Sequence, residues 1–486
     1  MKKECASECQ QQDCGSGAAT GGAKGCECGH EGARAVGRVG RNRERSFKRY
    51  KWSGWAILAA AFFVVFIHRY HIAAVADNLL APRPDGLGLS GTALGNLASI
   101  YFYFYALMQI PSGILCDSIG ARRTAFAGMT VTAIGSILTA LSGSLAMISI
   151  SRALVGIGTA VIYVGVLRYQ TLWFPAERFA TMSGFTSITG NFGAMTAATP
   201  LAMLVLYAGW RGSFLVLGLV SFAMAILVYL IVRDYPQDLG FPAVTEQAGD
   251  SGLSFAELWR ALKTIVRNRM TWLYFLIYFG ASAATFSFNG LWGISYLMQV
   301  YQIPKETASS YTLLVSLGIA LGSPFWGWIS DISKRKKPII VGGTIVQTLL
   351  WIMLIAPAAD RPLLPKWLLP IVFFLIGFSA IVFVLAFAGA KENNNVRYSG
   401  TAISVVNSGG FLGGALTNAI VGVILDANWQ GKVIDGVRAF SQGAYHKAFW
   451  LFPAMVVLAL ICAILLPADR RKKESSVNSG ATSQVI

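Results

Sequence analysis

Gly113-Ile-Leu-Cys-Asp117-Ser-Ile-Gly120-Ala-Arg122-Arg123 is a short polar break between two long apolar runs, and a related stretch returns later in the chain. The second copy is Gly327-Trp-Ile-Ser-Asp331-Ile-Ser-Lys-Arg335-Lys336-Lys337. In both copies a glycine is followed four residues later by an acid and then by a cluster of bases. This recurrence indicates two homologous halves rather than two unrelated domains.

A second echo supports the repeat. The stretch ERFATMSGFTSITGNFGA is matched later by VRYSGTAISVVNSGGFLGGA. The corresponding residues are Arg178, Gly190 and Phe192 in the first stretch and Arg397, Gly409 and Phe411 in the second. Two independent matches therefore relate the two halves of the chain.

The composition points to a membrane protein. Of the 486 residues, 55% are hydrophobic and 13% are charged, and the mean hydropathy is +0.55. Apolar runs recur along the whole chain, long enough to cross a hydrocarbon core of roughly 30 Å. The net charge of +17 comes from short basic clusters between these runs and in the tails. That distribution is a topology signal, so we expect no nucleic-acid partner.

The sequence predicts an all-α integral membrane protein with twelve transmembrane segments in two six-helix halves. Lys and Arg gather after every second segment and in both tails, so we expect both termini in the cytoplasm of a multi-pass protein of the bacterial inner membrane. The predicted segments are 54–80, 91–114, 124–144, 146–173, 180–207, 212–232, 271–299, 307–330, 338–357, 366–390, 399–425 and 445–467.

The segments divide the chain into five parts. We expect a disordered cytoplasmic tail, rich in Cys and Gly and then basic, over 1–53, and helix bundles over 54–232 and 271–467. The linker 233–270 contains an amphipathic helix, and 468–486 is a second cytoplasmic tail. The tail cysteines match no standard zinc spacing, so a reduced tail is favoured over a metal site. These cysteines are Cys5, Cys9, Cys14, Cys26 and Cys28.

With these motifs the chain resembles the major facilitator superfamily over residues 54–467. The features that carry the resemblance are the twelve segments, the loop at Gly113 and its weaker copy, and the pattern R-x-x-x-G-x-G at Arg152, Gly156 and Gly158. The resemblance implies alternating access around one cavity and a structural or proton-coupling part for Arg152. It also implies that the loop motifs act in the gate, through Asp117, Arg122, Arg123 and Asp331. The fifth-helix G-P-x-x-G-G pattern of drug antiporters in this superfamily is absent, so drug export is less favoured.

Arg69 is the leading candidate for substrate binding. It lies about 22 Å along the helix axis from Gly54, which is membrane depth. A charge there is costly unless it meets water, an anion or a partner. His68 and His71 share a face of the same helix and are candidate proton carriers, although either could simply bond a neighbouring helix.

Other polar residues inside the segments complete the predicted site. Tyr101, Tyr105 and Gln109 form a polar stripe at four-residue spacing, and Arg168 belongs either to the cavity or to the gate. The second half supplies amides and an aromatic side chain, which suit hydroxyl, amide or carboxylate groups. They are Asn289, Trp292 and Asn407, and for such amides bonding between helices is the commoner role.

The leading hypothesis is a secondary active transporter of a small organic anion or zwitterion that carries a carboxylate or phosphate group, with proton symport. Drug or siderophore efflux by proton antiport is the alternative within transport, and a non-transporting membrane sensor is the alternative outside it. No Walker-type loop, H-E-x-x-H or G-x-S-x-G pattern is present, so neither ATP-driven transport nor a membrane enzyme is favoured. We expect no cofactor, a monomer, and the bilayer, the proton and the substrate as partners.

Overall fold

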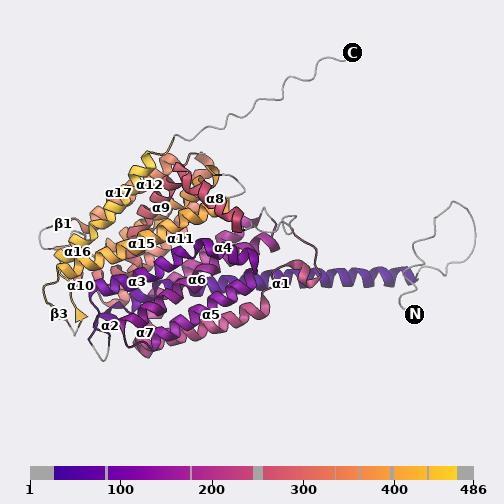
Figure 1. Ribbon diagram of the computed structural model, residues 1–486, viewed down its shortest axis with the longest axis horizontal. Helices are drawn as coiled ribbons and strands as arrows, with labels where there is room; N and C mark the ends of the chain where they lie inside the picture. The colour runs from indigo at the N-terminus through magenta and orange to yellow at the C-terminus, as the bar shows by residue number, and fades with distance from the viewer. Residues whose placement is uncertain are drawn as a thin grey trace, which may run out of the picture. The chain divides into compact units, whose positions relative to one another are not determined.

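The computed structural model describes residues 27–82, 86–175, 178–244, 255–333, 335–358, 361–362, 364–394, 399–434 and 437–467. Residues 1–49 and 50–486 form separate units, and each is considered by itself. The second unit contains both halves of the repeat. Its secondary structure is almost entirely helical (Figure 1).

The first half contains seven α-helices in the described residues, and the first of them begins in the tail. They are α1 (Glu27–Ala74), α2 (Ala76–Leu80), α3 (Gly91–Leu107), α4 (Gln109–Ser118), α5 (Ala121–Ala140), α6 (Leu145–Trp173) and α7 (Phe179–Ile231). The linker contributes the short 3-10 helix η3 (Pro236–Leu239) and α8 (Phe255–Arg267).

The second half begins with α9 (Arg269–Ser287), the π-helix η5 (Phe288–Trp292), α10 (Gly293–Val300), α11 (Lys305–Ser333) and α12 (Lys337–Ile355). Then follow α13 (Leu369–Ala380), the 3-10 helix η6 (Ile381–Val384), α14 (Leu385–Glu392), α15 (Ser399–Ala427), α16 (Gln442–Phe449) and α17 (Leu451–Ile464). Two antiparallel hairpins lie in its loops: β1 (Pro357–Ala358) with β2 (Arg361–Pro362), and β3 (Val433–Ile434) with β4 (Val437–Arg438).

Local chemistry sets several helix boundaries. The side chains of Ser90, Ser144 and Ser441 each accept an N–H from the first turn of the helix that follows, which satisfies donors that have no partner inside the helix. The long element α7 is two helices joined at Gly209, whose φ of 71° belongs to the left-handed region. Glycine adopts this conformation without a side-chain clash, and so the chain turns there.

Small residues let helices approach closely. A Cβ atom on Gly158 of α6 would lie 2.4 Å from the carbonyl oxygen of Gly128 in α5, so neither helix tolerates a larger residue at this contact. Such contacts are typical of helix packing in membranes, where water does not drive association. In Figure 1, α3 of the first half runs beside α15 of the second, and the two pack along their lengths.

The predicted segments match the helices well. Each of the twelve overlaps one or more helices, and nine helices plus the bent pair α3–α4 have the length and hydropathy of membrane spans in the described residues. The count of twelve spans stays a prediction. The described backbone of the tail differs from the disorder that we expected over 1–53, because α1 already begins at Glu27. Six of the residues over 27–50 are Arg, which favours helices, and Lys48 pairs with Glu44 one turn away.

Candidate functional site

Arg69 lies deep in α1 and is nearly enclosed, with 5% of its surface exposed. Its guanidinium carbon stands 4.4 Å from the centre of the Phe66 ring and 5.0 Å from the rings of Tyr105 and Phe411. These rings come from α1, α3 and α15, so both halves of the chain surround the charge. Its Nε atom has no hydrogen-bond partner among the described residues. The rings stabilise the cation, and one donor stays available to an anion.

Tyrosine and amide groups extend this cluster. The side chains of Tyr70 and Tyr101 interact with the guanidinium of Arg69, and Tyr70 also interacts with Asn289. Asn289 lies in the π-helix η5 and donates from Nδ2 to Ser316 Oγ over 3.2 Å. Single π turns are frequent at functional sites. The structure therefore brings together Arg69, Tyr101 and Asn289, three of the residues that the sequence predicts for substrate binding.

Arg152 adds a second buried cation. It is 1% exposed, its Nη1 donates to the carbonyl oxygen of His68 over 3.3 Å, and its guanidinium lies 4.9 Å from the centre of the Tyr101 ring. Its Nε and Nη2 atoms have no partner in the described structure. No carboxylate forms an ion pair with Arg69 or Arg152 among the side chains that the structure describes. Buried charge of one sign with unused donors is arranged to hold an anion.

The two histidines turn toward α7. His68 Nε2 lies 2.8 Å from Ser221 Oγ, and His71 Nε2 lies 2.8 Å from Ser213 Oγ. The His71 ring also stacks on Phe214 at a centroid distance of 3.8 Å. Both side chains are fully buried, and each keeps an Nδ1 atom without a partner among the described residues. The histidines thus bond a neighbouring helix, which is the alternative role that the sequence left open.

The other predicted substrate residues fall into two groups. Gln109 and Asn407 meet across the halves, because Asn407 Nδ2 donates to Gln109 Oε1 over 2.9 Å. Tyr105 contacts both Arg69 and Phe411, so it belongs to the central cluster. Trp292 is fully buried in the large apolar cluster at one end of the molecule, and its Nε1 has no partner in the described structure.

The predicted gate loop is held within the first half. The backbone N–H of Arg122 donates to Asp234 Oδ1 over 2.8 Å, and its Nε donates to the carbonyl oxygen of Tyr229 over the same distance. Arg123 is exposed, and the side chains of Asp117 and Asp331 lie outside the described part of the structure. Burial raises the pKa of Asp234, and the Arg122 N–H opposes that shift. Asp234 therefore binds the first turn of α5, next to the predicted gate loop.

Two further predictions concern Arg168 and the cysteines of the tail. Arg168 is partly exposed, so its place between cavity and gate is left open. Cys5, Cys9, Cys14 and Cys26 and the side chain of Cys28 lie outside the described residues. In the described part of the chain, no group of three or more His, Cys, Asp or Glu side chains is arranged to hold a metal ion.

Sequence reasoning missed the aromatic residues around Arg69. Phe66 lies three residues before it on the same helical face, and Phe411 belongs to the second repeat echo, so both carried a weak signal. Asp234 was missed because it lies just beyond the end of its segment, two residues after Val232, where an acid is ordinary. The feature of the sequence that could have indicated this contact is Gly120. A Cβ atom there would lie 2.5 Å from the Asp234 carboxylate, so the contact needs a glycine.

Known proteins share this architecture. A solved bacterial homologue of the human lysosomal transporter Spinster, in an inward-facing and unoccupied conformation, superimposes with a TM-score of 0.68 at 18% identity and covers 85% of this chain and 96% of that one. Among characterised sequences, the membrane sensor protein UhpC of Escherichia coli K12 is 25% identical over 397 residues, which is 78% of this chain and 86% of UhpC. A probable hexose phosphate transport protein of Chlamydia trachomatis serovar D is 23% identical over 80% of this chain and 85% of its own length.

The family model gives the broadest match. The Major Facilitator Superfamily model aligns with residues 54–292 and again with residues 274–485, which together cover most of the chain. The double match agrees with the internal repeat and with the helical halves seen in the structure. This chain belongs to the Major Facilitator Superfamily.

Proposed function

We propose that the protein is a secondary transporter of a small organic anion that carries a carboxylate or phosphate group, and that it works by alternating access. The observation that carries this proposal is the buried guanidinium of Arg69 between the two halves, with an unused Nε donor. A membrane-buried cation of this kind is stabilised by an anionic ligand, and a guanidinium binds a carboxylate or phosphate through two N–H bonds. The hexose phosphate relative agrees with this substrate class.

Orientation and coupling belong to the same proposal. Basic clusters follow the two copies of the repeated loop, at Arg122 and Arg123 and at Arg335, Lys336 and Lys337. By the positive-inside rule these clusters support a cytoplasmic position for that end. The proposal puts both termini there and the protein in a bacterial inner membrane. We call this end the basic end and the opposite end the outer end.

Proton symport by a monomer completes the proposal. The candidate coupling residues are His68, His71 and Arg152, which lie together in the buried part of the first half. A histidine can gain or lose a proton near neutral pH when its surroundings change, so anion binding next to these groups can be linked to proton uptake.

The first test measures binding to purified protein. Carboxylates, organic phosphates, dipeptides and cationic drugs are screened for their effect on thermal stability. An anion should stabilise the wild-type protein, and Arg69→Ala should weaken its binding by about 100-fold or more. Arg69→Lys should rescue little, since an ammonium does not reproduce the planar fork of donors. Arg123→Ala, which removes an exposed arginine, is the matched control and should bind normally.

Two outcomes would contradict the substrate class. One is a folded Arg69→Ala protein with unchanged anion affinity, and the other is stabilisation by cationic drugs alone. For coupling, His68→Gln and His71→Gln should spare exchange across liposomes and remove accumulation driven by a proton gradient. If these variants instead lower the melting temperature and keep accumulation, the histidines serve to bond Ser221 and Ser213.

A membrane sensor is the second candidate, because the relative UhpC carries that description. A sensor binds its ligand without moving it in quantity. Uptake of the stabilising anion into liposomes separates the two functions: binding without uptake above the Arg69→Ala background favours the sensor.

A further inference from the structure

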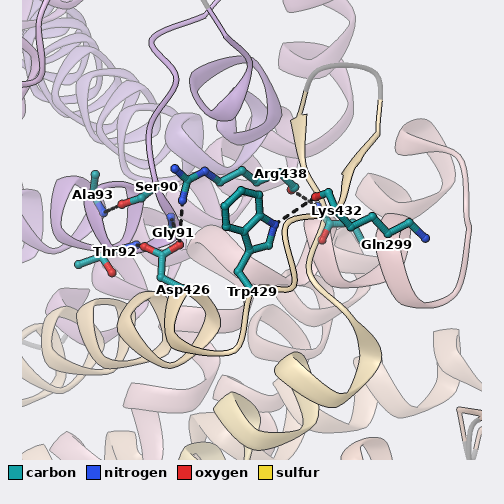
Figure 2. A network of polar contacts seen from close by, with 9 residues as sticks. All are labelled: Ser90, Gly91, Thr92, Ala93, Gln299, Asp426, Trp429, Lys432 and Arg438. Carbon is teal, nitrogen blue, oxygen red and sulfur yellow. Dashed lines mark hydrogen bonds and ion pairs between the residues drawn. The ribbon is translucent and has the colours of Figure 1, made fainter.

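A cluster of polar contacts closes the outer end of the molecule, and it joins the two halves (Figure 2). Asp426 in the last turn of α15 accepts the backbone N–H of Gly91 at Oδ1 over 2.8 Å and that of Thr92 at Oδ2 over 2.7 Å. These amides begin α3 in the first half. The first amides of a helix have no partner within it and carry its positive end, so a carboxylate there is strongly bound.

Arg438 approaches the same carboxylate from the second half. Its Nη1 lies 3.6 Å from Asp426 Oδ1, and its guanidinium lies 4.4 Å from the centre of the Trp429 ring. Gln299 donates from Nε2 to the carbonyl oxygen of Arg438 over 3.4 Å, and Trp429 Nε1 donates to the carbonyl oxygen of Lys432 over 3.1 Å. Arg438 is therefore bonded to its own half next to Asp426, while its strand β4 (Val437–Arg438) also packs against α2 of the first half.

The helices below this contact are in direct backbone contact. A Cβ atom on Gly422 would lie 2.4 Å from the carbonyl oxygen of Gly91, and one on Gly95 would lie 2.4 Å from that of Asn418. One turn further in, Ser99 Oγ donates to the carbonyl oxygen of Ala415 over 2.6 Å. Such close packing has no intermediate state, because a small separation of α3 from α15 already removes the van der Waals contacts between them. The start of α3 is thus either docked on Asp426 or withdrawn from it.

We propose that Asp426 is the residue that positions the outer gate, with α3 as its partner when that end is closed and Arg438 as its remaining partner when that end is open. The proposal rests on the alternating-access transport proposed above. Withdrawal of α3 removes two hydrogen bonds from a carboxylate that is 19% exposed. In this proposal α2 and α3 withdraw together and Arg438 stays beside Asp426, so it keeps the charge paired and stabilises the open state.

The two variants at this contact should have effects of opposite sign. Asp426→Asn keeps the shape but weakens the bonds to α3, so the ratio of outer-open to outer-closed molecules should rise about tenfold. Arg438→Gln leaves α3 bound and removes the partner of the open state, so the same ratio should fall about threefold. The double variant should match Asp426→Asn, because Arg438 acts through Asp426.

Spin-label distances in the full-length protein in nanodiscs measure the ratio, without substrate and in a background free of native cysteines. An outer pair at Tyr207 and Val433 and an inner pair at Ile119 and Ile332 use side chains that are at least 43% exposed. Opening of the gate lengthens the outer distance and shortens the inner one. Lys432→Gln is the control. Lys432 takes part in the cluster only through its backbone carbonyl, so removal of its side-chain charge should change neither distance.

Shifts of opposite sign for Asp426→Asn and Arg438→Gln support the proposal. Shifts of the same sign, no shift, or a longer outer distance without a shorter inner one would overturn it. Arg438→Gln, on a partly exposed hairpin, tests it even if Asp426→Asn does not fold. If the two variants shift the ratio in opposite directions but the protein binds no anion, the proposal for the gate is supported and the proposal of an anionic substrate is contradicted.

Discussion

The outer end and the basic end of the molecule are built differently. At the outer end, polar contacts cross between the halves: Asp426 holds α3, and Lys305 of α11 lies 3.3 Å from Asp77 of α2. A large apolar cluster also lies there and contains buried residues of both halves, such as Leu94 and Leu297. The outer end is therefore closed by contacts between halves.

The basic end is organised within each half. In the first half Arg122 binds Asp234 and the Tyr229 carbonyl, and in the second half Asn268 donates to Asn394 Oδ1 over 3.0 Å. Lys336 also forms an ion pair with Glu392 of its own half. Two smaller contacts do cross: Ile110 of α4 packs on α8 and α15, and the neighbouring Gln109 accepts a hydrogen bond from Asn407. The contrast teaches that, among the described residues, fewer specific contacts between the halves must break at the basic end than at the outer end.

The largest effect is expected where backbone meets backbone at the outer end. In Gly422→Ala the new Cβ atom would meet the carbonyl oxygen of Gly91 at 2.4 Å, so α3 and α15 must move apart. Overpacking of this kind costs about 1–3 kcal/mol. We expect the outer distance to lengthen in most molecules and the rate of substrate exchange to fall at least tenfold.

The matched control lies at the basic end. A Cβ atom on Gly342, in the second turn of α12, meets no atom within 4 Å, so Gly342→Ala should leave the distances and exchange unchanged. If both variants behave alike, the difference between the two ends does not govern the cycle.

A smaller effect is expected at the second contact between halves. Lys305 and Asp77 are each 19% exposed, so their ion pair is partly screened and weak. Lys305→Gln should raise the outer-open ratio about two- to fivefold, measured with the same label pairs. Asp77→Asn should do the same, and the double variant should add nothing, since either change removes the same pair. Additive shifts would show that the two residues act separately.

Much of the fold was predictable because long apolar runs in the sequence mark the segments that can cross a membrane. The repeat indicated two halves, and the position of Arg69 on its helix indicated a buried charge, which the structure confirms. The hydrophobic face of the linker also predicted a helix, seen as α8. These features depend on local periodicity, which a single sequence records.

Contacts between helices were harder to predict. Asp426 follows the last predicted residue of its segment, and nothing in the local pattern says that the start of α3 lies opposite it. The partners of His68 and His71 were left open for the same reason, because period and spacing define a face but do not name the neighbour. The aromatic ring of Phe411 reaches Arg69 only through the packing of α15 on α3.

The smallest effect is expected at Asp234, outside the membrane-spanning segments. Burial raises its pKa above the ordinary value of 3.8, so the folded protein keeps the proton to a higher pH than the unfolded chain does. The contribution of this group to the free energy of unfolding is therefore complete below about pH 3.8 and is lost as the pH rises through the folded pKa. Asp234→Asn keeps an acceptor for the Arg122 N–H and avoids that loss. The variant should melt about 1 °C higher than wild type at pH 7 and equally at pH 4. The inner and outer distances should not change, since this contact stays within one half. A clear change in the inner distance would instead make Asp234 and Arg122 part of a gate, and the basic end would then be closed by specific contacts as the outer end is.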